Sequence, residues 1–235
     1  EELLQFFPKA RIERMDMDTT KGKYGFEKII HRFERGETDI LVGTQMVSKG
    51  LDFPKVGLVG VMNADLFLHQ PDFRASERAF QLLSHIAGRA GRKGQGQVLI
   101  QTYNPFQETL QRVKEGDYMG MITTQLAERH DFHYPPYYRL IRISFRHREL
   151  ERINQAGQWF ADGLRTGLAA YHVEVLGAEF PPISRIRNEY IKHILLKIAP
   201  KVPLPVVKDY ILRLEQSFYS TAVFRPVILS YSVDP

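Results

Sequence analysis

The chain has 235 residues, of which 43% are hydrophobic, and a formal net charge of +5. This length and composition predict one large or two ordinary globular domains. No apolar run approaches the roughly twenty residues that a bilayer span needs, and the first residues resemble neither a signal nor a transit peptide. Cysteine is absent, which excludes disulfides, and the histidines show no ligand spacing. We expect a cytoplasmic protein with no membrane partner and no metal site.

The first half of the chain alternates predicted strands and helices. Strands are predicted at 11–18, 39–43, 56–63 and 97–103, and helices at 21–35 and from Ser76. In the 21–35 helix, apolar residues recur at helical spacing after the candidate caps Thr19 and Thr20, at Phe26, Ile29, Ile30 and Phe33. Such alternation predicts a parallel sheet with helices on its faces. Because strand carboxyl ends carry the chemistry in such folds, we expect the functional residues on one rim.

A polar loop follows the buried strand at 39–43. It contains Thr44, Gln45, Ser48, Lys49, Gly50 and Asp52. Each has a structural alternative to a functional role, because an aspartate can cap a turn, a glycine can permit a positive φ and a lysine can be a surface residue.

A basic, glycine-rich loop runs from His85 to Arg92. Arg89 and Arg92 are three residues apart, which lets two guanidinium groups converge on one small anion. A predicted helix leads into the loop and a predicted strand leaves it, the setting expected of phosphate-sensing arginines in an ATPase. The alternative is a basic surface turn, since a short motif also occurs by chance.

These two loops together resemble motifs V and VI of superfamily 2 helicases. With Pro71–Arg74, Glu77–Arg78, Tyr134–Tyr137 and the final Asp234–Pro235, the chain resembles the PriA family of bacterial primosomal replication-restart helicases (primosomal protein N′) over essentially its whole length. It departs from the family at His85, where a glutamine usually opens the block.

The resemblance implies a role for each loop residue. Arg89 and Arg92 would reach the γ-phosphate of ATP. The nucleotide-side residues would be Gly50, Asp52, His85 and Gly88. The DNA backbone would be held by Thr44, Gln45, Ser48 and Lys49. For Arg74, Glu77 and Arg78, DNA contacts and internal ion pairs both remain open.

The sequence contains only half of such an ATPase site. It has no GxxxxGK[ST] loop and no acidic strand-end motif for magnesium. By resemblance, ATP and Mg²⁺ would be bound mainly by a missing first lobe, and Zn²⁺ by a cysteine-rich module upstream, after which this chain would have been cut. We therefore expect the fragment alone to be inactive.

The intact protein would be an ATP-dependent 3′ to 5′ DNA helicase. The resemblance implies that it restarts replication at stalled or abandoned forks and starts primosome assembly. Its partners would be forked or single-stranded DNA, the single-stranded-DNA-binding protein and primosome components. Its location would be the bacterial cytoplasm, in association with the nucleoid.

The second half of the chain has a different pattern. Residues 111–134 predict a helical linker, and Pro135–Pro136 marks a boundary. The order after it is a strand at 139–146, a helix at 149–171, strands at 173–180 and 190–199, a helix at 204–218 and a strand at 223–233. This is the βαββαβ, or split βαβ, plan. The predicted fold is therefore α/β, with a RecA-like second helicase lobe at 1–110 and a smaller α+β carboxyl-terminal domain at 135–235.

Basic residues mark two places in this second domain. Alternation along the 139–146 strand turns Arg142, Ser144 and Arg146 to one face and Ile141, Ile143 and Phe145 against the core. In the 149–171 helix, residues spaced three and four apart predict one buried stripe: Leu150, Ile153, Gly157, Phe160, Leu164 and Leu168. The turn containing Arg185 and Arg187, near Tyr190 and His193, is the better candidate for a phosphate or an unpaired base. The alternative for any one arginine is a solvated surface.

Two other functions remain open from the sequence. One is a different superfamily 2 translocase acting on DNA or RNA. The other is a non-enzymatic nucleic-acid-binding module, in which replacing Arg92 would weaken DNA affinity rather than ATP turnover.

Overall fold

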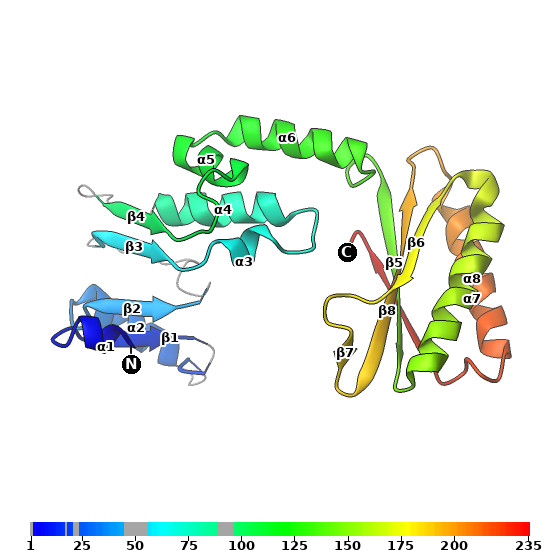
Figure 1. Ribbon diagram of the computed structural model, residues 1–235, viewed down its shortest axis with the longest axis horizontal. Helices are drawn as coiled ribbons and strands as arrows, with labels where there is room; N and C mark the ends of the chain where they lie inside the picture. The colour runs from blue at the N-terminus through cyan, green and yellow to red at the C-terminus, as the bar shows by residue number, and fades with distance from the viewer. Residues whose placement is uncertain (1, 17, 21–23, 45–55, 89–95) are drawn as a thin grey trace. The chain divides into compact units, whose positions relative to one another are not determined.

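The computed structural model describes residues 2–16, 18–20, 24–44, 56–88 and 96–235. The chain divides into two compact units, Glu1–Thr123 (unit 1) and Thr124–Pro235 (unit 2). Both units contain helices and strands (Figure 1). None of the helices in the described ranges combines the length and apolar character that crossing a bilayer demands.

Unit 1 contains two parallel strand pairs and several helices. Its elements are α1 Glu2–Phe6, β1 Ile12–Met15, α2 Gly25–Glu34, β2 Ile40–Gly43, β3 Leu58–Val61, α3 Asp65–Leu68, α4 Ala75–Ala87, β4 Gln97–Ile100, α5 Glu108–Glu115 and the first part of α6 Tyr118–Asp131. β1 pairs with β2 and β3 pairs with β4, both in parallel. Parallel pairing agrees with the sequence prediction, but the described residues form two pairs rather than one continuous sheet.

The start of α2 differs from the prediction. Thr19 and Thr20 do not cap this helix, which begins at Gly25 after Tyr24 without a side-chain cap. The Thr20 hydroxyl instead donates to the Asp16 carbonyl oxygen at 2.6 Å, and the Thr19 backbone N–H donates to the Asp16 carboxylate at 3.0 Å. These side chains form a local turn after β1, because Thr and Asp satisfy nearby backbone groups as readily in turns as in caps.

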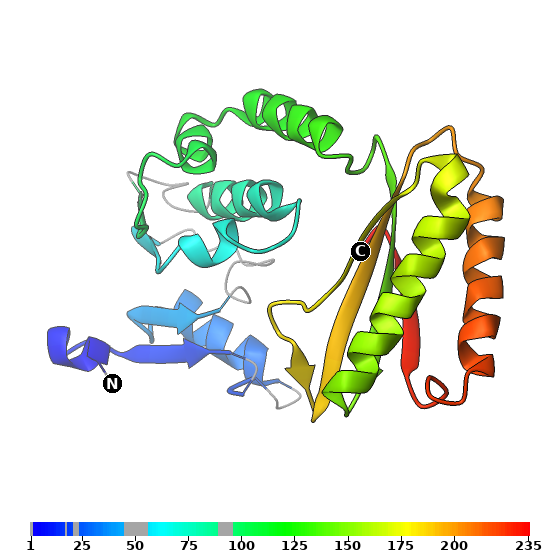
Figure 2. The same cartoon turned by 45° about the vertical axis from the view of Figure 1, so that its right-hand side comes forward.

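Unit 2 is one antiparallel sheet with two long helices. Its elements are the end of α6, β5 Arg139–His147, α7 Leu150–Leu168, a short 3₁₀ turn Ala169–Tyr171, β6 Glu174–Glu179, β7 Arg185–Ile186, β8 Glu189–Ile198, α8 Leu204–Ser220 and β9 Ile228–Val233. The strand order is β6-β8-β5-β9, and β7 pairs with β8. Both α7 and α8 lie on one face of this sheet (Figure 2).

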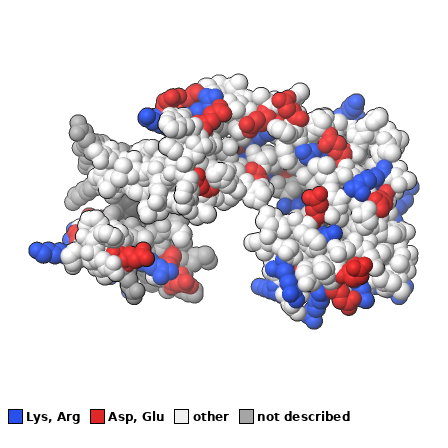
Figure 3. Space-filling view, in the orientation of Figure 1, with Lys and Arg blue, Asp and Glu red and all other residues white. Residues whose placement is uncertain are grey.

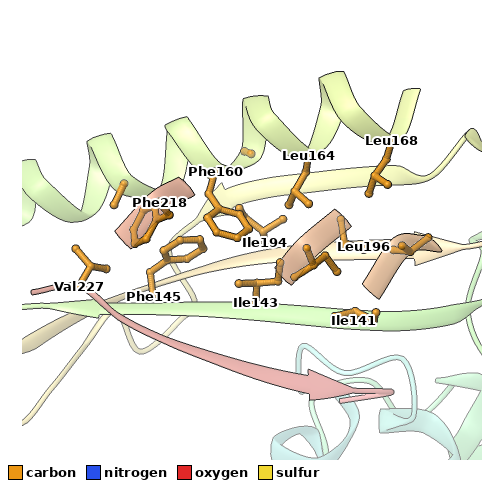
Figure 4. Close-up of a cluster of buried hydrophobic side chains, with 14 of the residues drawn as sticks. Ile141, Ile143, Phe145, Phe160, Leu164, Leu168, Ile194, Leu196, Phe218 and Val227 are labelled. Carbon is orange, nitrogen blue, oxygen red and sulfur yellow. The ribbon is translucent and has the colours of Figure 1, made fainter. Parts of the chain in front are cut away.

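The alternation of β5 separates core from surface as predicted. Ile141, Ile143 and Phe145 point toward α7 and are at most 4% exposed (Figure 4). The predicted stripe on α7 is wrong at one position, because Leu150 is 45% exposed. Leu150 is the first residue of α7, ahead of the turn that reaches the sheet.

An aromatic cluster fills the centre of this core. The ring of Phe160 on α7 lies 5.5 Å from those of Phe145 and Phe218, both in edge-to-face geometry. Trp159 packs 5.7 Å from Phe218, and Phe224 stacks on Phe218 at 4.8 Å. Phe224 lies in a stretch predicted as strand, but β9 begins only at Ile228, since the chain first turns Phe224 inward.

Two glycines let α7 and α8 approach closely. A Cβ added at Gly167 would lie 1.8 Å from the Tyr210 ring, and one at Gly163 would lie 2.7 Å from Leu214. The Tyr210 hydroxyl also donates to the Gly163 carbonyl at 2.8 Å. The close packing of α7 against α8 therefore requires glycine at these two positions of α7.

We expect Gly167→Ala to destabilise unit 2. Helix propensity alone would favour alanine by about 1 kcal/mol. The clash with Tyr210 outweighs it, because overpacking a tight contact costs about 1 to 3 kcal/mol. Urea unfolding followed by circular dichroism measures the difference. The control is Thr166→Ala at an exposed position on the same helix, which should be neutral or slightly stabilising. Equal stability of the two variants would contradict this packing.

Candidate functional site

Most of the unit 1 residues expected to contact the nucleotide or the DNA lie outside the described residues. These are Gln45, Ser48, Lys49, Gly50, Asp52, Arg89 and Arg92. Of the expected set in unit 1, the structure describes Thr44, His85 and Gly88. Thr44 is exposed in a bend directly after β2, and His85 and Gly88 are exposed at the end of α4.

The described members do not gather on one rim as predicted. Thr44 follows the carboxyl end of β2. α4, however, runs antiparallel to β3 and β4, so that His85 and Gly88 lie toward the ends where these strands begin (Figures 1 and 2). The prediction was wrong because it applied the strand-end rule to residues at the end of a helix. Gly88 itself has a helical φ of −69°, so its backbone conformation does not require glycine.

α4 is firmly packed behind this helix end. Ala79, Phe80 and Leu83 on α4 are at most 4% exposed. They form one cluster with residues of β3, α3, α5 and α6, including Val61 and Leu110. This burial fixes the direction in which α4 carries the chain into the following loop.

The block before α4 is organised around Asp72. Its carboxylate forms an ion pair with Nη1 of Arg78 at 2.6 Å and accepts a hydrogen bond from the backbone N–H of Arg74 at 2.9 Å. The Arg74 guanidinium lies 4.3 Å from the centre of the Phe73 ring, and Glu77 accepts from Gln81 at 3.2 Å. Arg78 thus forms an internal ion pair, one of the two roles that the sequence left open for it. Asp72 was not singled out from the sequence, although an Asp shortly before a predicted helix is a recognisable cap signal.

Asp65 links the ends of β3 and β4. Its carboxylate accepts from the Thr102 hydroxyl and from the Tyr103 backbone N–H, each at 3.0 Å. Burial raises the pKa of the Asp65 carboxyl, but the hydrogen bonds from Tyr103, Thr102 and its own backbone N–H, with the charge of His69, together lower it below its usual value. Asp65 therefore fastens the loop after β4 to the first turn of α3.

The second candidate site is the hairpin between β7 and β8. Its turn consists of Arg187 and Asn188, with φ values of 49° and 66°, the pattern of a two-residue type I′ turn. The Arg185 guanidinium lies 4.8 Å over the Tyr190 ring and also donates to Asn188. Arg187 is exposed at the tip, and its side chain forms no hydrogen bond or ion pair with a described residue. Lys and Arg side chains, with acidic ones beside them, are visible at this end of unit 2 (Figure 3).

Two lysines of β8, Lys192 and Lys197, are engaged inside unit 2. Lys197 is 7% exposed, donates to the Phe132 carbonyl at 2.6 Å and lies 3.9 Å over the Tyr134 ring. Burial lowers its pKa, and the charge of Glu174 opposes that shift. Lys192 packs on the Phe180 ring at 4.6 Å. These two lysines fasten segments to the sheet rather than extending the basic surface.

His193 lies away from the hairpin turn, contrary to the grouping expected from the sequence. It stands opposite Ser144 in the pairing of β5 with β8. Burial lowers its pKa, and the charge of Arg142 adds to that effect. No local pattern indicates this proximity, because it depends on the register between strands some fifty residues apart.

No cluster of three or more His, Asp or Glu side chains suitable for a metal ion occurs among the described residues.

Comparison with known proteins identifies both halves of the chain. Residues 1–94 match the helicase conserved C-terminal domain, and residues 130–235 match the primosomal protein N C-terminal domain. The chain belongs to the PriA family. Its match to the C-terminal domain of primosomal protein N shows that it corresponds to the C-terminal part of the PriA proteins, as the resemblance predicted.

The PriA relatives come from diverse bacteria and are named replication restart protein PriA. The Bacillus subtilis protein is 41% identical over 213 residues, which is 90% of this chain and 26% of the relative. The Synechocystis protein is 42% identical over 88% of the chain and 25% of the relative, and the Chlamydia muridarum protein is 33% identical over 100% and 30%. The chain thus spans only about a quarter to a third of the PriA relatives.

We expect Asp65→Asn to lower the melting temperature of unit 1 at pH 7. The asparagine cannot offer two charged oxygens to Thr102 and Tyr103. Because folding lowers the pKa of Asp65, its contribution is present above the unfolded pKa, about 3.9, and is lost as the pH falls through the folded value. The difference from the unchanged chain should therefore shrink toward pH 3.

A matched control is Glu115→Gln, an exposed carboxylate on α5. Thermal melts of both variants at pH 7 and near pH 3 provide the measurement. A loss for Asp65→Asn that equals that of the control, or does not change with pH, would contradict the role of Asp65.

Proposed function

We propose that this chain is the second motor lobe and carboxyl-terminal domain of an ATP-dependent 3′ to 5′ DNA helicase that restarts replication at stalled or abandoned forks and starts primosome assembly. The RecA-like lobe would comprise residues 1–110, the helical linker 111–134 and the carboxyl-terminal domain 135–235. The element order β5-α7-β6-β8-α8-β9 supports the split βαβ plan for the last of these, with β7 as an added strand.

One observation carries the proposal. A packed helix, α4, leads directly into Gly88–Arg92 in a chain whose first part matches a helicase C-terminal domain and whose last part matches the primosomal domain. A basic module that only gripped phosphates would need neither this pairing of domains nor a rigid helix ahead of the two arginines.

Arg89 and Arg92 would act on the ATP bound mainly by the first motor lobe. Their guanidinium groups would approach the γ-phosphate and stabilise the charge that develops as the phosphoryl group leaves. Gly50, Asp52, His85 and Gly88 would lie on the nucleotide side and couple its state to the DNA. ATP with Mg²⁺ supplies the phosphoryl group, and Zn²⁺ would belong to a cysteine-rich module outside this chain.

DNA would be held by both units. Thr44, with Gln45, Ser48 and Lys49 after it, would contact the sugar-phosphate backbone, which positions a strand without reading its sequence. On unit 2, the Arg185 guanidinium, which lies over the Tyr190 ring, and the exposed Arg187 in the turn would contact the DNA. Single-stranded-DNA-binding protein and primosome components would be the protein partners, in the bacterial cytoplasm near the nucleoid.

In the intact protein, we expect Arg92→Ala to lower the ATP turnover rate by at least about 10³-fold, the magnitude typical of an arginine finger. DNA affinity should stay unchanged. ATPase assays and DNA titrations on the same preparation test both statements. Lys114→Ala, an exposed cation on α5, is the control and should leave both values unchanged. Lost DNA affinity with normal ATP turnover would instead favour a non-enzymatic binding module.

For the 235-residue chain alone, we expect salt-sensitive binding of forked DNA and no ATPase activity. Fluorescence anisotropy at about 50 and about 200 mM salt measures the binding. Arg187→Asn should weaken it without loss of thermal stability, because asparagine tolerates the positive φ of this turn. ATP hydrolysis by the chain alone would contradict the half-site, and absent binding would assign the DNA contacts to other parts of the helicase.

A further inference from the structure

The helix α6 begins in unit 1 and ends in unit 2, and its first half belongs to the core of unit 1. Met121 of α6 is 3% exposed and packs in the same cluster as Phe80 and Leu83 of α4. The ring of Tyr118, the first residue of α6, lies 6.1 Å from the ring of Phe80. α6 therefore contacts the helix that leads into Gly88–Arg92.

The start of α6 is fastened to α5 by one guanidinium group. Arg112 of α5 donates to the carboxylate of Glu108 at 2.8 Å and to that of Asp117, the residue before α6. The Asp117 carboxylate also accepts from the backbone N–H of Gly120 at 2.8 Å. A Cβ added at Gly120 would lie 1.8 Å from Nη1 of Arg112, so the guanidinium lies directly against the first turn of α6. The beginning of α6 thus has a fixed place in unit 1.

The other end of α6 is held by a lysine of unit 2. Lys197 of β8 is 7% exposed, and its ammonium group donates to the Phe132 carbonyl oxygen at 2.6 Å. Phe132 directly follows the last residue of α6. The carbonyl groups at the end of a helix have no partner within the helix and carry partial negative charge, so they attract cations. Lys197 therefore caps α6 from a strand 65 residues further along the chain.

A histidine adds a second contact at this end of α6. His133 pairs with Glu174 of β6, and its ring stacks 4.2 Å from the Tyr138 ring. Glu174 and Leu140 both stand opposite Lys197 in the strand pairings, on the face of the sheet away from α7 and α8. Leu140 is only 1% exposed there, because the chain after α6 covers this part of the face. We call Lys197, His133 and Glu174 the α6 anchor.

Stability alone does not account for a lysine in the α6 anchor. Burial lowers the pKa of Lys197, and the charge of Glu174 only partly opposes that shift. Among the described residues, the one hydrogen-bond acceptor of Lys197 is a neutral carbonyl group. An apolar residue of similar volume in place of a buried charge is often neutral or stabilising. The buried ammonium group therefore costs stability, and what it provides is a fixed position for the end of α6.

We propose that Lys197 is a positioning residue of the helicase motor, which holds the end of α6 so that DNA bound by unit 2 accelerates ATP hydrolysis in the motor lobe. The connection runs from Lys197 along α6 to Phe80 on α4. α4 in turn leads into the loop of Arg89 and Arg92, which lie outside the described residues. Packed elements of this kind can carry coupling between distant sites. The inference rests on the proposed function and adds a residue that touches neither ATP nor DNA.

The test compares Lys197→Met with Lys208→Met in the intact helicase. Methionine is flexible and of similar length, but it has neither the charge nor the donor. Lys208 is an exposed cation on α8, on the face of the sheet away from the α6 anchor, so it undergoes the same chemical change elsewhere. ATP turnover is measured at saturating ATP with and without forked DNA, and DNA affinity is measured by fluorescence anisotropy.

We expect Lys197→Met to lower the DNA-stimulated kcat about tenfold, a size typical of coupling between two sites. The KM for ATP, the rate without DNA and the Kd for DNA should stay unchanged, because Lys197 contacts neither ligand. Lys208→Met should leave all four values unchanged.

Two measurements on the 235-residue chain separate positioning from simple support. Lys197→Met should keep or raise the melting temperature, because it removes a buried charge. Hydrogen exchange should nevertheless become faster at the backbone amides of Phe132 and Tyr134, which close the last turns of α6. Lys208→Met should not change this exchange.

A second variant tests the α6 anchor if Lys197→Met does not fold. His133→Asn keeps the backbone conformation, because asparagine tolerates the positive φ of 58° at this position. It lacks the imidazole that pairs with Glu174. We expect the same loss of DNA stimulation relative to Lys208→Met.

The remaining outcomes overturn the inference in distinguishable ways. If Lys197→Met keeps the full DNA-stimulated rate, the positioning role is wrong while the proposed function stands. A lower melting temperature together with lower rates both with and without DNA would mean that Lys197 only supports the fold. If the unchanged helicase hydrolyses ATP no faster with DNA, the inference fails together with the coupling of ATP to DNA in the proposed function.

Discussion

Ile141, Ile143 and Phe145 point from β5 into the aromatic core beneath α7, and this burial determines the rest of unit 2. Because side chains alternate along a strand, the intervening Arg142 and Ser144 must face the other way. A slip of one residue would bury the arginine and expose the apolar side chains, so the register is strongly specified. Burial of the apolar side chains thus also determines which residues lie on the polar face of the sheet.

Charged residues in this molecule fall into two groups with different consequences. Arg78 and Lys197 are held by internal partners, and each fastens a segment to the packed element beside it. Arg142 and Arg187 have no such partner among the described residues. Counting basic residues in the sequence cannot separate the two groups, because the difference lies in contacts with residues far along the chain. The internal contacts also explain why a positive net charge is weak evidence for the location of a binding surface.

Periodicity predicted the element types well, because the apolar stripes of α2, α7 and β5 are long and regular. It failed at the edges: Thr19 and Thr20 turn back to Asp16, and β9 starts late because Phe224 is drawn into the core. The motif residues were recognisable from sequence, but the expected common rim does not hold for Thr44, His85 and Gly88, since the direction of α4 depends on packing. The pairing of His193 with Ser144 depends on strand register, which no local pattern contains.

The packing of Trp159 has a spectroscopic consequence. It is the only tryptophan in the sequence, and it lies beside Phe218 and Phe224 in the core of unit 2. Its emission will therefore respond when this core opens and will be silent to unfolding confined to unit 1. Tryptophan fluorescence and far-ultraviolet circular dichroism, recorded in the same titration, will diverge wherever the two units do not unfold together.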